Sequence, residues 1–128
     1  MAIHIDRLDH QVYLNVLSGP LTLQDLQQAM RAMRELADQN QDSSYVVVSD
    51  AVELRNIPFD LQNLRKLAQI DPRMVAVVVV KSPFLVKVVS DIVSKVTPLT
   101  IEHRETREEA LERARQLVQE HTQQMKSE

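Results

Sequence analysis

The chain has 128 residues, with 15 Lys and Arg, 18 Asp and Glu, no cysteine, one glycine and a net charge of -3. This length suits one domain, and the lack of cysteine excludes disulfides, thiolate zinc sites and a cysteine nucleophile. One glycine is too few for a Gly-rich phosphate loop or a dinucleotide fingerprint, and a slightly acidic chain is a poor general binder of nucleic acid.

The chain also lacks the patterns that direct a protein to or through a membrane. Its first residues show no secretory signal, and its longest apolar run is far shorter than the roughly 20 residues that span a bilayer. We therefore expect a cytoplasmic protein with no integral membrane insertion.

The first elements predicted are the two strands of a β-hairpin. Residues 2–6 alternate in a two-residue period, and residues 12–17 are mainly apolar, with a polar turn at residues 8–11. The Ser-Gly-Pro at residues 18–20 is predicted to end the second strand. Apolar residues at helical spacing then predict a helix from about Thr22 to Asn40.

The middle of the chain predicts a strand, a loop and a second helix. Residues 45–49 form a short apolar run, and Asp50 follows at its carboxyl end. Residues 51–60 show no clear period and are predicted to be a loop. Leucines at helical spacing from Leu61 onward predict a helix that ends at Asp71 and Pro72.

A continuous apolar run at residues 74–80 predicts an inner strand, because seven such residues without alternation need cover on both faces of a sheet. Ser82 suits a helix N-cap and Pro83 a first helical position, so a third helix is expected to follow directly. Its apolar face is wider than a surface helix needs.

The last elements predicted are a short strand at residues 99–103 and a helix. Thr106 and Glu109 form a capping box at the start of this helix. Its charged residues, which include Arg107 and Arg113, are expected to form a solvated face. We assign residues 1–121 to a single domain and residues 122–128 to a polar tail.

The predicted order is ββαβαβαβα, an α/β fold with a mixed five-stranded sheet and four helices. This order resembles the STAS/SpoIIAA-like superfamily, and especially the bacterial SpoIIAA-like proteins related to STAS and CRAL-TRIO domains. Three local patterns carry the resemblance: residues 17–22 (LSGPLT), residues 45–50 (YVVVSD) followed by residues 59–61 (FDL), and residues 73–80 (RMVAVVVV) followed by residues 82–85 (SPFL).

The resemblance implies a regulatory domain of the kind found in anti-sigma-factor antagonists. Those proteins switch by phosphorylation of a Ser or Thr at the start of the second helix. Asp50 stands where the aspartate at the strand end of that family is found. The matching segment here, residues 56–61, contains no Ser, Thr or Gly. We therefore do not expect kinase-controlled partner switching through this loop.

Few residues indicate chemistry. The spacing of the four histidines, His4, His10, His103 and His121, requires no metal site, and Ser18, Ser49 and Ser82 fit strand ends and caps better than a nucleophile. We predict no catalytic residue, metal or cofactor. Lys81 and Ser82 are a candidate anion contact, since backbone N–H groups at a helix start and a nearby ammonium can hold an anion. The alternative is an ordinary lysine at a strand end beside a capping serine.

A candidate patch of apolar residues lies around the predicted second and third helices. Exposed together, these residues would mark an interface or a groove, whereas their alternative role is to complete a core that is poor in aromatic residues. The members of the patch are Ile57, Phe59, Phe84, Val86, Val89 and Val93.

These observations lead to two functional hypotheses. The first is a non-enzymatic STAS-like interaction or regulatory module, which binds a protein partner or itself, most simply as a homodimer. The alternative is a carrier of a small apolar or lipid-like ligand whose anionic head group meets Lys81. A pocket of about 300 Å³ or more beside the third helix would favour the carrier.

Overall fold

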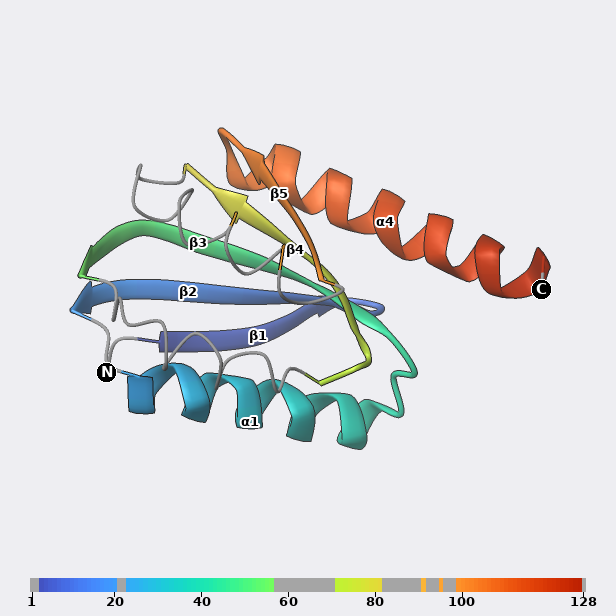
Figure 1. The fold of residues 1–128 in the computed structure, drawn as a ribbon, viewed down its shortest axis with the longest axis horizontal. Helices are drawn as coiled ribbons and strands as arrows, with labels where there is room; N and C mark the ends of the chain where they lie inside the picture. Colours follow the sequence, from blue (N-terminus) through green and yellow to red (C-terminus); the bar gives the residue numbers. More distant parts are fainter. Residues whose placement is uncertain are drawn as a thin grey trace.

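The computed structural model describes residues 3–20, 23–56, 71–81, 91, 95 and 99–127. Along the chain these residues form β1 (Ile3–Asp9), β2 (Val12–Pro20), α1 (Leu23–Asn40), β3 (Tyr45–Asn56), β4 (Met74–Val80), β5 (Thr100–Arg104) and α4 (Arg107–Ser127). In Figure 1 the sheet lies between the two helices, with α1 on one side and α4 on the other.

The strands form one mixed sheet in the order β1-β2-β3-β4-β5. β1 and β2 are antiparallel, as expected for a hairpin, and every other neighbouring pair is parallel. The predicted α/β fold with a mixed five-stranded sheet is therefore confirmed.

Within the described residues, the number and order of helices differ from the prediction. The described residues contain two helices, α1 and α4, instead of four, so their order is ββαβββα and not ββαβαβαβα. The expected second helix falls on residues outside the described part. Of the expected third helix, the structure describes Asp91 and Lys95, which are both helical.

Two hydrophobic clusters hold the helices to the sheet, because successive side chains of a strand point to opposite faces. The cluster under α1 contains Tyr13, Met33, Ala37, Tyr45 and Val47. The cluster under α4 contains Val12, Leu14, Val46, Val48, Ala76, Val78, Val80, Ala110, Ala114 and Leu117. β4 contributes side chains to both, as its uninterrupted apolar run predicted.

Strands β2 and β3 are longer than the sequence predicted. Residues 18–20 belong to β2, which ends at Pro20, and β3 continues past Asp50 into the predicted loop and ends at Asn56. The two extensions pair with each other, Ser18 with Glu53 and Pro20 with Asn56, across two register shifts. Because the pairing is irregular, the extensions do not keep the two-residue period of a regular strand from end to end, so the sequence pattern did not predict them. Pro20 is tolerated because it lies at the end of a strand.

Helix α1 ends in a Schellman motif without the usual glycine. The Gln41 N–H donates to the Asp38 carbonyl at 3.3 Å, and the Asp42 N–H donates to the Ala37 carbonyl at 3.0 Å. The motif requires a left-handed residue, and Gln41 accordingly has φ of 55°. A residue with a Cβ atom is less favourable in this conformation than glycine.

A polar network lies beside the cluster under α1. The rings of Tyr13 and Tyr45 stack with centroids 4.5 Å apart. Both tyrosines are fully buried. Tyr13 donates its hydroxyl to Asp42 Oδ2 at 2.7 Å, and Tyr45 donates to Asp71 Oδ2 at 3.2 Å. Burial and the neighbouring carboxylates raise the pKa of both phenols, so they remain protonated donors.

Each carboxylate of this network also binds an arginine. Arg7 donates to both oxygens of Asp42 at 3.1 Å, and Arg73 Nε lies 3.0 Å from each oxygen of Asp71. Burial favours the neutral form of Asp42 and Asp71, but hydrogen bonds from the arginines and tyrosines outweigh it. The pKa of each carboxyl therefore lies below its ordinary value. Arg73 continues to Asp38 of α1 at 2.8 Å, so the network ties the helix to the sheet.

The left-handed residue at the end of α1 generates a stability prediction. We expect Gln41→Gly to raise the free energy of unfolding by about 1 kcal/mol, because glycine removes the steric cost of the left-handed conformation. The control is Gln39→Gly, two residues earlier in the helix and also exposed. This change should lower stability by about 1 kcal/mol. Urea unfolding measures both, and equal losses for the two variants would contradict the prediction.

The buried carboxylates generate a pH prediction. Their pKa is lower in the folded than in the unfolded chain, so their contribution to stability is present above about pH 4 and is lost as the pH falls through the folded pKa values. We expect Asp42→Asn to lose about 2 kcal/mol at pH 7 and to show a smaller further loss between pH 6 and pH 3 than the unaltered protein.

Urea unfolding across this pH range tests the effect of Asp42. Glu35→Gln, at an exposed position of α1, is the control. It should leave the stability at pH 7 and the loss of stability between pH 6 and pH 3 unchanged. A pH dependence identical in Asp42→Asn and the unaltered protein would show that the carboxylate is not held ionised by its partners.

Candidate functional site

The carboxyl ends of the parallel strands carry an ion pair between β3 and α4. Arg107, the first residue of α4, donates through Nε and Nη2 to Asp50 Oδ2 at 3.1 and 2.7 Å. Asp50 is buried, whereas the Arg107 side chain is 45% exposed. The buried carboxylate thus has the partner that it needs, while part of the guanidinium faces solvent. Open α/β sheets commonly bind their ligands at this end.

Lys81 also lies at this end, directly after β4. Its backbone N–H donates to the Arg104 carbonyl at 2.8 Å, which places it beside the last residue of β5. The residue is exposed and left-handed, with φ of 46°. The second member of the predicted anion contact, Ser82, lies outside the described residues, so the contact stays a prediction.

The candidate apolar patch falls on residues that the structure does not describe. Ile57, Phe59, Phe84, Val86, Val89 and Val93 all lie outside the described part. Along the chain, Ile57 follows the last residue of β3, and Ser82 follows Lys81. The two segments that supply the patch therefore both start from the carboxyl end of the sheet.

The predicted solvated face of the last helix is partly wrong. Glu108, Glu112 and Arg115 are exposed, as expected. Arg113, however, binds Glu102 of β5 through Nε and Nη2 at 2.9 and 3.0 Å. These hydrogen bonds lower the pKa of Glu102 and hold it ionised. Arg107 is likewise paired with Asp50, and α4 continues as a helix through Ser127, into the predicted tail.

The sequence carried a signal for the Arg107 pair that its interpretation missed. A cation in the first turn of a helix faces the positive end of the helix dipole and is unfavourable there without a partner. Arg107 occupies such a position, and an aspartate that directly follows an apolar run, such as Asp50, is a suitable partner.

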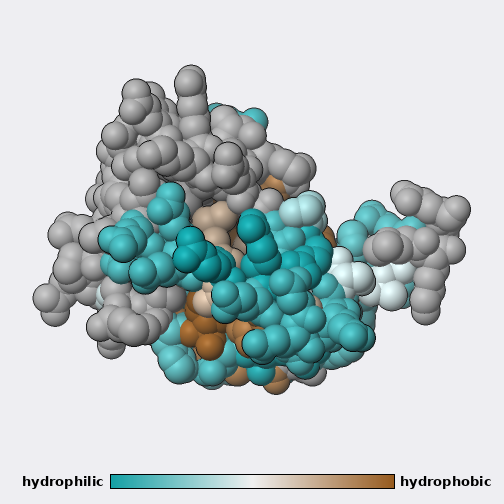
Figure 2. Space-filling model, turned by 90° about the horizontal axis from the view of Figure 1, so that it is seen from below, coloured by the Kyte–Doolittle hydropathy of each residue, from teal (hydrophilic) through white to brown (hydrophobic). Residues whose placement is uncertain are grey.

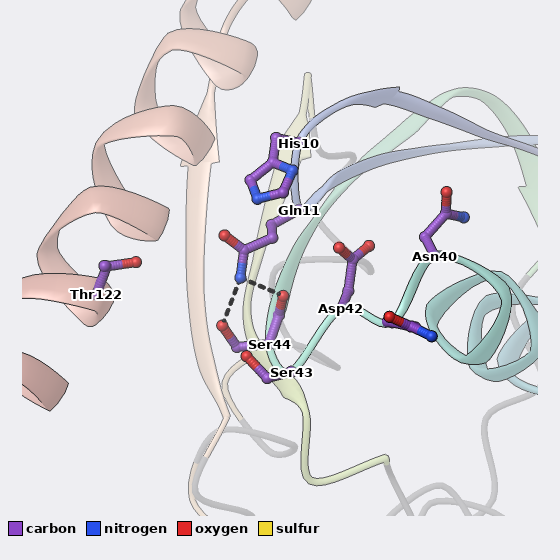
Figure 3. Close-up of a pocket in the computed structure, with 8 residues that line it drawn as sticks. His10, Gln11, Asn40, Asp42, Ser43, Ser44 and Thr122 are labelled. Carbon is purple, nitrogen blue, oxygen red and sulfur yellow. Dashed lines mark hydrogen bonds between the residues drawn. The ribbon is translucent and has the colours of Figure 1, made fainter.

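A second candidate site is a pocket of about 380 Å³ at the opposite end of the sheet (Figure 3). It lies between the β1–β2 turn, the segment from α1 to β3, and α4. The residues around it are polar: His10, Gln11, Asn40, Gln41, Asp42, Ser43, Ser44 and Thr122. No sequence pattern predicted this pocket, because its lining comes from three separate segments.

The outer face of α1 is largely hydrophilic. Figure 2 looks onto this side of the molecule, where the described surface is mainly hydrophilic with a small hydrophobic area. The exposed side chains of the helix include Gln24, Gln28, Arg31, Arg34 and Glu35. A broad apolar interface is therefore not formed by the described residues of α1.

Neither a metal cluster nor a membrane span is present among the described residues. No group of three or more His, Cys, Asp or Glu in that part of the chain is placed to hold an ion. The exposed His4 instead pairs with Asp6 at 2.8 Å. Of the helices described, none has the length and apolar character that crossing a bilayer requires.

Comparison with known proteins places the fold. No protein-family model and no curated protein matches the chain. Among solved structures, the chain resembles SpoIIAA, a cell-fate determinant of Bacillus, in its phosphorylated form. The sequences are 15% identical, the TM-score is 0.53, and the match covers 88% of this chain and 98% of SpoIIAA. The chain therefore has a STAS/SpoIIAA-like fold.

Proposed function

We propose that this protein is a non-enzymatic STAS-type module that regulates through contacts with another protein or with a second copy of itself. The observation that carries the proposal is the SpoIIAA-like fold, which extends over 88% of the chain. SpoIIAA is a cell-fate determinant, and its phosphorylated form has been solved. A regulatory role for the present chain is compatible with that fold and with a cytoplasmic setting.

The ionised carboxylates support a role other than acid-base catalysis. Asp42, Asp71 and Glu102 each bind an arginine, and their pKa values lie below the ordinary range. A general acid or base works best with a pKa near the operating pH, which these groups do not approach. Their arrangement instead suits the fixing of strands and helices.

We place the contact surface at the carboxyl end of the parallel strands. Arg107 is half-exposed there, Lys81 is exposed, and Glu105 and Glu108 are exposed beside Arg107, so groups of both charges face solvent at this end. The two segments that contain the candidate patch start from the same end. Apolar residues beside charged groups would fit a partner with an apolar centre and residues of complementary charge around it.

No observation favours the alternative of a lipid-like carrier. The described pocket lies at the opposite end of the sheet from Lys81 and has a polar lining. An anionic head group would find no lysine among these residues.

Site-specific photo-crosslinking in the native cell tests the proposed surface. A photoreactive benzoylphenylalanine in place of Lys81 should form a protein adduct that mass spectrometry identifies as a partner or a second copy. The matched control replaces Gln28, which is exposed on α1. Adducts at Gln28 alone, or none at Lys81, would contradict the proposed surface.

Self-association is tested separately by sedimentation velocity. If the candidate patch forms a homodimer, Phe84→Asp should decrease the dimer fraction at least about tenfold, because an ionised carboxylate in an apolar interface is strongly unfavourable. The control is Leu8→Asp, at a large apolar side chain that is 44% exposed on β1. Unchanged association would exclude Phe84 from the interface, and loss of cooperative unfolding would instead place this residue in the core.

A further inference from the structure

The pocket at the amino end of the parallel strands has side-chain acceptors that remain available to a ligand. In Figure 3, Thr122 of α4 lies across the pocket from Gln11 and Ser44. Gln11 donates through Nε2 to the Ser44 carbonyl at 2.9 Å and to Ser44 Oγ at 3.0 Å. A carbonyl can only accept, so this bond fixes the orientation of the amide and leaves Gln11 Oε1 as the remaining acceptor.

Two further lining residues each have one donor engaged in a similar way. Asn40 Nδ2 donates one hydrogen to the Leu36 carbonyl at 2.8 Å, which leaves Asn40 Oδ1 as an acceptor and the second N–H as a donor. Thr122 donates its hydroxyl proton to the Val118 carbonyl at 2.9 Å, which leaves the oxygen lone pairs. Ser44 has the opposite role, because its oxygen accepts from Gln11 and its own O–H can still donate.

The charge of the pocket is balanced. Asp42 provides its one carboxylate, and that group is already bound by Arg7 and Tyr13. No lysine or arginine is among the described residues that line the pocket. Among the described lining residues, an anion would therefore meet mainly acceptor oxygens without a lysine or arginine as partner, and a cation would compete with a guanidinium that is already in place.

We propose that this pocket binds a small neutral molecule with several hydroxyl groups, such as a monosaccharide. The hydroxyl groups can donate to acceptors such as Gln11 Oε1 and Asn40 Oδ1, and one of them can accept from Ser44. The volume of about 380 Å³ lies at the lower end of the range for small-molecule sites and is sufficient for a molecule of this size. The site is separate from the protein-contact surface proposed above.

Three probes of similar size and different charge test the proposal: glucose, glucosamine and gluconate. Each is titrated into the isotope-labelled full chain, and amide resonances are followed by NMR. Glucose should shift the amides of residues 10–11, 40–44 and 122 with a dissociation constant in the millimolar range. Glucosamine and gluconate should bind at least about threefold more weakly. Absence of these shifts with glucose, or equal binding of all three probes, would overturn the proposal.

Matched threonine variants test the position of the site. Thr122→Val removes the oxygen from the pocket and nearly preserves the shape of the side chain, and it should weaken glucose binding about three- to tenfold. Thr100→Val, at an exposed threonine of β5, should leave binding unchanged. Thr122→Ala provides a second variant if the first disturbs α4. Equal affinities for the pocket variants and the unaltered protein would overturn the assignment, as would an equal loss in the Thr100 variant.

Discussion

Two buried tyrosines impose the constraint on which the amino end of the sheet depends. Tyr13 and Tyr45 are fully buried, and a phenolic hydroxyl that is removed from water needs a hydrogen-bond partner. Each hydroxyl meets an aspartate. A buried carboxylate in turn needs a cation, because an unpaired charge there costs several kcal/mol. The tyrosines of β2 and β3 therefore each need an aspartate, and each aspartate needs an arginine. These arginines are Arg7 in β1 and Arg73 just before β4.

This constraint explains why one short segment determines both the end of α1 and the shape of the pocket. The Asp42 backbone N–H closes the helix on the Ala37 carbonyl, while its carboxylate accepts from Tyr13 and Arg7. The same residue lines the pocket. Because the position of Asp42 is fixed by three separate contacts, its neighbours Ser43 and Ser44 are held at the edge of β3. The polar pocket therefore has a fixed backbone at Asp42, although most of its lining residues lie in turns.

Local signals predicted most of the sheet, whereas contacts between distant segments escaped prediction. The uninterrupted apolar run at residues 74–80 is β4, and the Thr106 hydroxyl accepts from the Glu109 N–H as the capping box required. Both signals lie within a few neighbouring residues. The extension of β2 through residues 18–20 instead depends on pairing with a segment more than thirty residues away. The pair of Asp50 and Arg107 and the polar pocket likewise join separate parts of the chain, which no local pattern records.

The two ends of the sheet differ in how exposed the arginines of their ion pairs are to solvent. At the amino end, each aspartate beside a tyrosine is buried. Removing its arginine would therefore leave an unpaired carboxylate in the core. At the carboxyl end, the guanidinium of Arg107 is 45% exposed. Water already solvates part of it, so a carboxylate of a partner can join the contact while the buried Asp50 keeps its hydrogen bonds from Arg107. Charge-dependent recognition of a macromolecule is therefore easier at the carboxyl end, whereas the amino end favours a neutral ligand that leaves its ion pairs intact.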